Sequence, residues 1–153
     1  MTKTVRRKIL RANAIWLVIA ASGGLLMDVL GIFFGRGPQS GIGAVAPQAG
    51  VGLIEAHGLA LIFGVLLWHA ERPLRYWHFT AATAHALLGV ANLVFWQYFI
   101  AGGMLVAGYL TTLLHWLFVA LQLWAAIGTL KPITKNTGMA LSAALCRRYS
   151  TRY

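Results

Sequence analysis

The sequence predicts an all-α integral membrane protein, a bundle of four transmembrane helices with both termini in the cytoplasm. Three observations predict this fold class. Of the 153 residues, 59% are hydrophobic and only 10% are charged, which is far from the composition of soluble domains. Apolar runs recur that are long enough to cross about 30 Å of hydrocarbon as helices. Lys and Arg gather at the two ends and in the middle of the chain, as the positive-inside rule expects for four spans.

The predicted spans are continuous runs of Leu, Ile, Val, Ala and Phe, which favour helices over the short alternating strands of a membrane barrel. A loop containing Gly and Pro follows the first span. A tight break at residues 70–73 and a Gly102-Gly103 hairpin separate the others. The four spans cover about residues 12–34, 50–70, 76–101 and 104–130.

Basic segments flank the predicted membrane domain, which covers residues 12–130. Residues 1–11 form a basic cytoplasmic N-tail, and the first span is too long to be a cleaved signal peptide. Residues 131–153 form a basic C-tail that either lies on anionic lipid or is disordered. These features indicate a multi-pass protein of the cell inner (plasma) membrane in contact with lipid. Because the cations cluster at helix ends instead of covering a face, they do not indicate a nucleic-acid partner.

Polar side chains inside the spans are the candidates for function, because ionisable groups at membrane depth are costly and usually mark a site. Each predicted helix carries one stripe of polar and small residues. For Thr111, Gln122 and the glycines, a helix-packing seam is the favoured interpretation. The set that is too polar for packing alone is Asp28, Glu55, His57, His85, Asn92 and His115.

Haem is the cofactor that this set suits best, because a neutral imidazole in an apolar bundle is a good axial ligand for iron. His57 has small neighbours, Gly58, Ala60 and Gly64, that would form a flat surface for a macrocycle. His85 also has small residues around it. By residue type alone the two histidines are comparable candidates. A single Cys excludes an intramolecular disulfide and a Cys-type zinc site.

Three collinear segments make the sequence similar to a known family. They are GLLMDVLGIF at residues 24–33, Ala56-His57 followed by Gly64, and GVANLVF at residues 89–95. On these segments the chain resembles the styrene oxide isomerases, which are small four-span membrane enzymes that use haem b.

The resemblance implies a haem b ligated by His57 and held between the protomers of a homotrimer. It also implies a reaction in which ferric iron acts as a Lewis acid and isomerises a hydrophobic epoxide to an aldehyde. Phe63, Asn92 and Trp96 occupy the pocket positions expected to be catalytic. Phe63 stands where the family has Asn, and Trp96 where it has Tyr, so both groups that orient the epoxide differ.

Two other functions remain open from the residues. A haem electron-transfer protein would use a second axial ligand, which His85 or His115 could supply. A haem-free small-molecule binder or transporter subunit would use Asp28 and Glu55 as its main polar contacts. The sequence therefore supports a haem-binding membrane protein, with isomerisation, electron transfer and simple binding as its alternatives.

Overall fold

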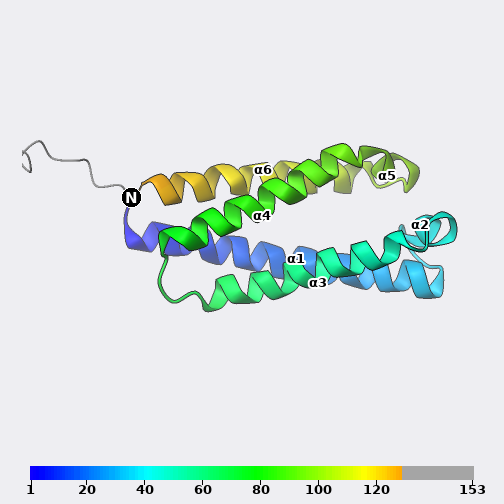
Figure 1. Ribbon diagram of the computed structural model, residues 1–153, viewed down its shortest axis with the longest axis horizontal. Helices are drawn as coiled ribbons and strands as arrows, with labels where there is room; N and C mark the ends of the chain where they lie inside the picture. Colours follow the sequence, from blue (N-terminus) through cyan, green and yellow to red (C-terminus); the bar gives the residue numbers. More distant parts are fainter. Residues whose placement is uncertain (129–153) are drawn as a thin grey trace, which may run out of the picture.

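The computed structural model describes residues 1–128, and all regular structure in this part of the chain is helical. Long helices lie side by side, and two short helices cap the end opposite the N-terminus (Figure 1). The predicted C-tail, residues 131–153, lies outside the described residues. The helices are α1 (Lys3–Phe34), α2 (Ser40–Val45), α3 (Ala49–His69), α4 (Arg75–Val94), α5 (Trp96–Ala101) and α6 (Leu105–Ile127).

Helix α1 begins much earlier than the predicted first span, so most of the predicted N-tail is helical. The Thr2 hydroxyl caps the helix by accepting a hydrogen bond from the Val5 backbone N–H at 3.3 Å. The guanidinium of Arg11 lies 4.1 Å from the ring centroid of Trp68 on α3, which ties this basic segment to the bundle. At its other end α1 stops at Gly35, whose φ of 62° is a left-handed conformation that glycine adopts without strain.

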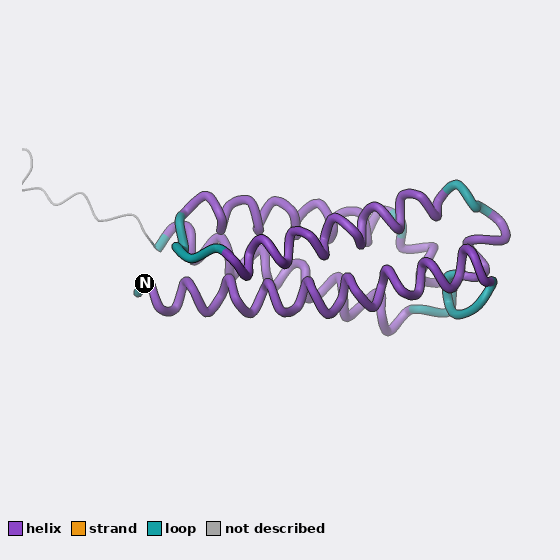
Figure 2. The backbone as a smooth tube through the Cα atoms, turned by 90° about the horizontal axis from the view of Figure 1, so that it is seen from below, coloured by secondary structure: helices purple, strands orange, loops and turns teal. Residues whose placement is uncertain are grey.

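Helices α1 and α3 form one antiparallel pair, and α4 and α6 form another (Figures 1 and 2). Gly64 allows the first pair to approach closely, because a Cβ there would lie 3.0 Å from the Leu17 side chain. Gly89 of α4 similarly faces Trp116 of α6, at 3.1 Å. Small residues at helix crossings are the usual basis of packing in membranes, where lipid offers no hydrophobic driving force between helices.

The two pairs meet in a core near the N-terminal half of α1. Leu10, Leu17, Leu67 and Ala81 are buried there together with Ala14. Phe63 is partly buried and packs against this core. Packing against the core therefore explains why an apolar side chain occupies position 63.

Two short helices differ from the predicted loops and spans. The first loop contains α2, which lies close to α1 because Gly43 lacks a Cβ that would be 3.2 Å from the Ile32 Cα. The predicted third span is interrupted at Phe95, where α4 ends and α5 begins. At this break Trp96 contacts Tyr109 of α6 in an edge-on arrangement, with the two ring centroids 4.8 Å apart. The turn at Gly102-Gly103 then confirms the predicted hairpin.

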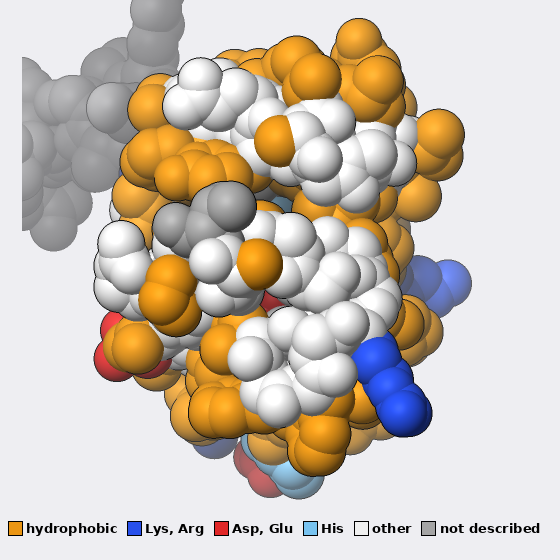
Figure 3. Space-filling model, turned by 90° about the vertical axis from the view of Figure 1, so that its right-hand side faces the viewer, with side chains coloured by type: hydrophobic (Ala, Val, Ile, Leu, Met, Phe, Trp, Pro, Cys, Tyr) orange, Lys and Arg blue, Asp and Glu red, His pale blue; other side chains and the backbone are white. Residues whose placement is uncertain are grey.

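Within residues 1–128, three helices are long and apolar enough to cross a membrane, namely α1, α3 and α6. Helix α4 has a comparable length but carries buried histidines, which lower its mean hydropathy. The end formed by α2 and α5 shows mainly apolar side chains and uncharged groups, with cations at one edge (Figure 3). The predicted membrane character is thus supported by composition and length, and all described elements are helices.

Candidate functional site

The strongest polar contact between α1 and α3 joins Asp28 and His57. Nδ1 of His57 lies 2.6 Å from Oδ2 of Asp28. The carboxylate accepts, so Nδ1 carries the proton and donates it, which leaves the lone pair of a neutral ring on Nε2. Asp28 is completely buried, whereas the His57 side chain is 33% exposed. The pair therefore presents a ring nitrogen at the surface and keeps its carboxylate inside.

Nε2 of His57 is open to a ligand. It makes no hydrogen bond within residues 1–128, and it is not among the buried polar atoms that lack a partner there. A Cβ added at Gly24 would collide with the His57 ring, and the nearest atoms, Nε2, Cδ2 and Cε1, lie at similar distances from that position. Gly24 consequently faces the flat side of the ring. The lone pair, which lies in the ring plane, is not directed at α1.

The charge of Asp28 has no counterion other than His57 in the described residues. Its second oxygen, Oδ1, is buried and without a hydrogen-bond partner, and no Lys or Arg forms an ion pair with it there. A buried carboxylate is costly unless a positive charge is close to it. An imidazolium, or a metal cation bound at Nε2, would supply that charge through the ring of His57.

The small residues beside His57 fall into two groups. Gly58 has nothing within 4 Å of the place where a Cβ would lie, so the surface next to the ligand candidate is open. Gly64 is buried against α1, and Ala60 packs on the core. Of the three small residues predicted to cradle a cofactor, the structure leaves Gly58 open for that role and uses the other two in packing.

A second polar cluster links α1, α4 and α6 inside the bundle. We call the chain of side chains His78–Gln122–Asn13–His85–His115 the interior network. Its four hydrogen bonds measure 2.5, 2.8, 2.5 and 2.9 Å in that order. His78, Gln122, Asn13 and His85 are all fully buried. Of these residues Asn13 was missed by the sequence reasoning, although an Asn in an apolar run, one turn from Leu10 and Leu17, is a detectable signal.

The donors of the interior network all point the same way. Nε2 of Gln122 donates to Oδ1 of Asn13, so Nδ2 of Asn13 donates to Nε2 of His85. His85 therefore keeps its proton on Nδ1 and donates it to Nδ1 of His115. Both nitrogens of His85 are in use, and its ring also stacks on Phe118 with centroids 5.1 Å apart. Binding iron at either nitrogen of His85 would break one of these hydrogen bonds, whereas Nε2 of His57 has none to break within residues 1–128, so the geometry favours His57.

The other predicted site residues lie apart from His57. Nδ2 of Asn92 donates to the Thr111 hydroxyl on α6 at 3.2 Å, and Trp96 contacts Phe99 and Tyr109. Glu55 is exposed on α3, two residues from His57. No group of three or more His, Cys, Asp or Glu side chains gathers around a common point within residues 1–128. A single axial ligand does not need such a group, because the porphyrin supplies the other nitrogen donors.

The chain has no match among protein-family models, characterised proteins or solved structures. The resemblance to the styrene oxide isomerases therefore stays a prediction from the three collinear segments. The structure brings two of them together, because Gly24 and Asp28 of the first segment both contact His57 of the second. The third segment contacts α6 through Gly89 and Asn92.

Proposed function

We propose that this protein binds haem b through Nε2 of His57. The observation that carries the proposal is the Asp28–His57 pair, at 2.6 Å. Histidines that bind metals almost always donate their other ring N–H to a carboxylate, a carbonyl or water, which fixes the ring and makes the ligating nitrogen more basic. The buried, otherwise uncompensated charge of Asp28 adds an electrostatic reason to place a cation at that nitrogen.

The position of His57 also bears on the oligomeric state. The ring lies at the surface of the α1–α3 pair, beside the open position at Gly58. Because His57 is part-exposed and Gly58 is open, these residues would hold a macrocycle at the surface of the bundle, where one protomer would leave part of it uncovered. A second copy of the chain would cover that part and exclude water. We therefore place the haem between protomers of a homotrimer, as the resemblance implies.

The proposed reaction is the isomerisation of a hydrophobic epoxide to an aldehyde. Ferric haem would supply a Lewis-acid iron, and an epoxide rearrangement needs no second substrate. This chain's contribution is to hold the iron through His57, to orient that ring through Asp28, and to keep the surroundings apolar. Because Phe63 and Trp96 differ from the family pattern, we expect a substrate other than styrene oxide.

We place the protein in the cell inner membrane with four spans and both termini in the cytoplasm. Helix α3 ends beside the N-terminus, whereas α6 begins at the opposite end of the bundle (Figure 1). Helix α4 runs between these two ends, so it would cross the membrane together with α3 and α6. Its polar groups are tolerable at that depth because His78 and His85 are buried in the interior network.

Electron transfer and haem-free binding receive less support. A second axial histidine would have to come from His85, whose nitrogens are both engaged, or from His115, which accepts a hydrogen bond from His85 at Nδ1. A binder that uses both acidic groups would need them on one surface. Asp28 is fully buried, and Glu55 is exposed.

The test is the absorption spectrum of the detergent-purified protein from haem-replete cells, oxidised and reduced. We expect a Soret band in the wild type, its loss in His57→Ala, and its retention in His69→Ala, which removes an exposed histidine from the end of the same helix. A colourless wild type, or a haem-loaded His57→Ala, would refute the proposal. Turnover of a panel of aryl and alkyl epoxides by the wild type, absent in His57→Ala, would then establish the isomerase activity.

A further inference from the structure

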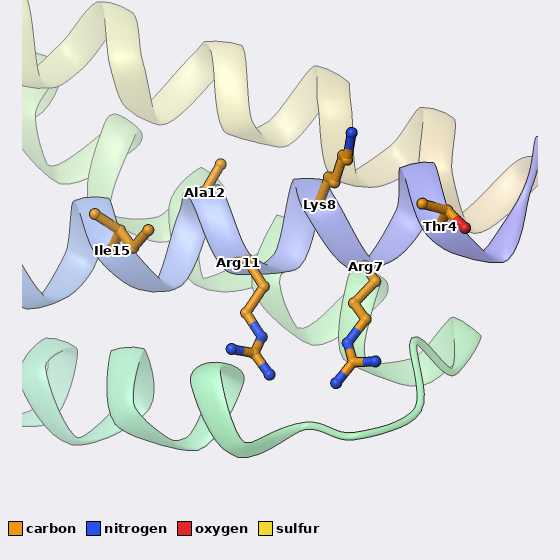
Figure 4. A pocket seen from close by; sticks show the side chains of 6 residues that line it. All are labelled: Thr4, Arg7, Lys8, Arg11, Ala12 and Ile15. Atoms are coloured by element: carbon orange, nitrogen blue, oxygen red, sulfur yellow. The ribbon is translucent and has the colours of Figure 1, made fainter.

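The basic end of α1 carries an open groove that the proposed haem site does not use. It has a volume of about 540 Å³ and is lined by Thr4, Arg7, Lys8, Arg11, Ala12 and Ile15 (Figure 4). Arg7 and Arg11 extend from one side of the helix, toward the segment that joins α3 and α4, and Lys8 extends from another. The cations thus form one end of the groove, and Ala12 and Ile15 form its apolar end.

The chain itself lacks the anions that these cations require. It contains 13 Lys and Arg residues but only 3 acidic ones, which are Asp28, Glu55 and Glu71. Asp28 is bonded to His57, and Lys8 and the two arginines form no ion pair within residues 1–128. Nε of Arg11 is buried and has no acceptor there. Like charges within about one helical turn repel one another, so an external anion would stabilise this arrangement.

The place of the groove along α1 favours a lipid as the source of this anion. At 1.5 Å per residue the 32-residue helix is about 48 Å long, well beyond the roughly 30 Å of hydrocarbon. Its charged end therefore reaches the headgroup region. The next exposed side chains toward the bundle centre are apolar, namely Ile15 and Ile19, which are 48% and 65% exposed. Trp68, which stacks on Arg11, is a side chain typical of the membrane interface.

We propose that this groove is a binding site for an anionic glycerophospholipid. The headgroup phosphate lies beside Arg7 and Arg11, and Lys8 adds positive charge from another side of the helix. One acyl chain follows Ala12, Ile15 and Ile19 along α1. Guanidinium groups suit this role because their fork of N–H donors matches phosphate oxygens. The inference requires the chain to be in a bilayer, but it does not depend on haem binding.

The experiment is native mass spectrometry of the full chain in detergent, titrated with dioleoyl phosphatidylglycerol or dioleoyl phosphatidylcholine. We expect retained phosphatidylglycerol adducts and few phosphatidylcholine adducts. The double variant Arg7→Gln/Lys8→Gln changes two exposed side chains, so the fold should persist. Each lost cation near a membrane surface weakens attraction about fivefold, so we expect about 25-fold weaker binding.

The matched control is Arg72→Gln/Arg75→Gln, which removes two exposed cations at the same end of the bundle but outside the groove. It should bind phosphatidylglycerol as the wild type does. Equal weakening of phosphatidylglycerol binding by both double variants would mean diffuse charge attraction and would overturn the proposed site.

Inorganic phosphate at millimolar concentration should not displace the lipid. Displacement would show a phosphate site in which the acyl chain has no role. Equal retention of the two lipids would also contradict the proposal.

Discussion

Two residues of α1 hold the ring of His57, one through a hydrogen bond and the other by leaving space for the ring. Asp28 accepts the Nδ1 proton, and Gly24 leaves room for the face of the ring. The two residues are one helical turn apart, so they lie on the same face of α1. Together they determine which nitrogen is free and where it points. Substitutions at either position therefore test the proposed ligand without removing it.

Asp28→Asn keeps the size of the side chain and removes its charge. We expect haem to bind about 10- to 100-fold more weakly, because an orienting partner of a ligand has effects of that size. Haem titration followed at the Soret band measures this change. Glu55→Gln removes an exposed carboxylate from α3 and should bind haem as the wild type does. An unchanged affinity in Asp28→Asn would show that the carboxylate does not support the ligand.

Gly24→Ala tests the room beside the ring. The added Cβ would collide with His57, and relieving the overlap should displace the imidazole and cost about 1–3 kcal/mol of stability. We expect reduced haem occupancy with His57 still present. Gly23→Ala is the matched control, because nothing lies within 4 Å of its added Cβ. If both variants bind haem equally, the ring is not fixed against Gly24.

Among the helices, the interior network decides how the two pairs are joined. Asn13 of α1 contacts both Gln122 of α6 and His85 of α4. Asn13 is therefore the one residue of the network that lies on α1, and it bridges the two helix pairs. Since the three inner members, Gln122, Asn13 and His85, each use a donor and an acceptor in series, loss of one of them leaves buried groups unpaired on other helices.

Asn13→Ala should destabilise the protein by about 1–3 kcal/mol, the cost of leaving buried polar groups without partners. Gln122→Ala should cost a similar amount, and the double variant should cost less than the sum because both break the same chain. Unfolding in mixed detergent, followed by circular dichroism, gives the three values. Gln97→Ala removes an exposed amide from α5 and should have little effect. Additive losses in the double variant would mean that the network does not act as a unit.

Sequence alone predicted the long helices because hydropathy marks their length, and it predicted the turns at residues 70–73 and 102–103 from Gly and Pro. It did not predict α2, the break at Phe95 or the helical start of α1. Contacts between elements accompany these features, such as Gly43 on Ile32 and Arg11 on Trp68, and the start of α1 is also capped locally by Thr2. The site shows the same division. The sequence identified both Asp28 and His57 as candidates. Their pairing depends on how α1 and α3 are aligned along their axes, and the polar residues of either helix alone do not reveal that alignment.

At the scale of the whole molecule, the two ends of the bundle differ in charge and in the elements that close them. The N-terminus, the α3–α4 connection and the end of α6 lie together, and α2 and α5 lie at the other end (Figures 1 and 2). The amino group of Met1 donates to the Gly128 carbonyl at 3.4 Å, which links the first and last described segments. Cations gather at this end, and on the positive-inside rule we propose that it faces the cytoplasm.

This assignment predicts how two single cysteines react with a membrane-impermeant maleimide in spheroplasts. In a Cys146→Ser background, Arg36→Cys places a thiol beyond α1, and Arg72→Cys places one between α3 and α4. Each replaces one exposed arginine, so the two variants are matched in charge. We expect Arg36→Cys to react in intact spheroplasts and Arg72→Cys to react only after permeabilisation, because four spans put these connections on opposite sides. The reverse pattern would invert the orientation. Reaction of both in intact spheroplasts would mean that α3 does not span, and the surface carrying His57 would then face water instead of lipid or a second protomer.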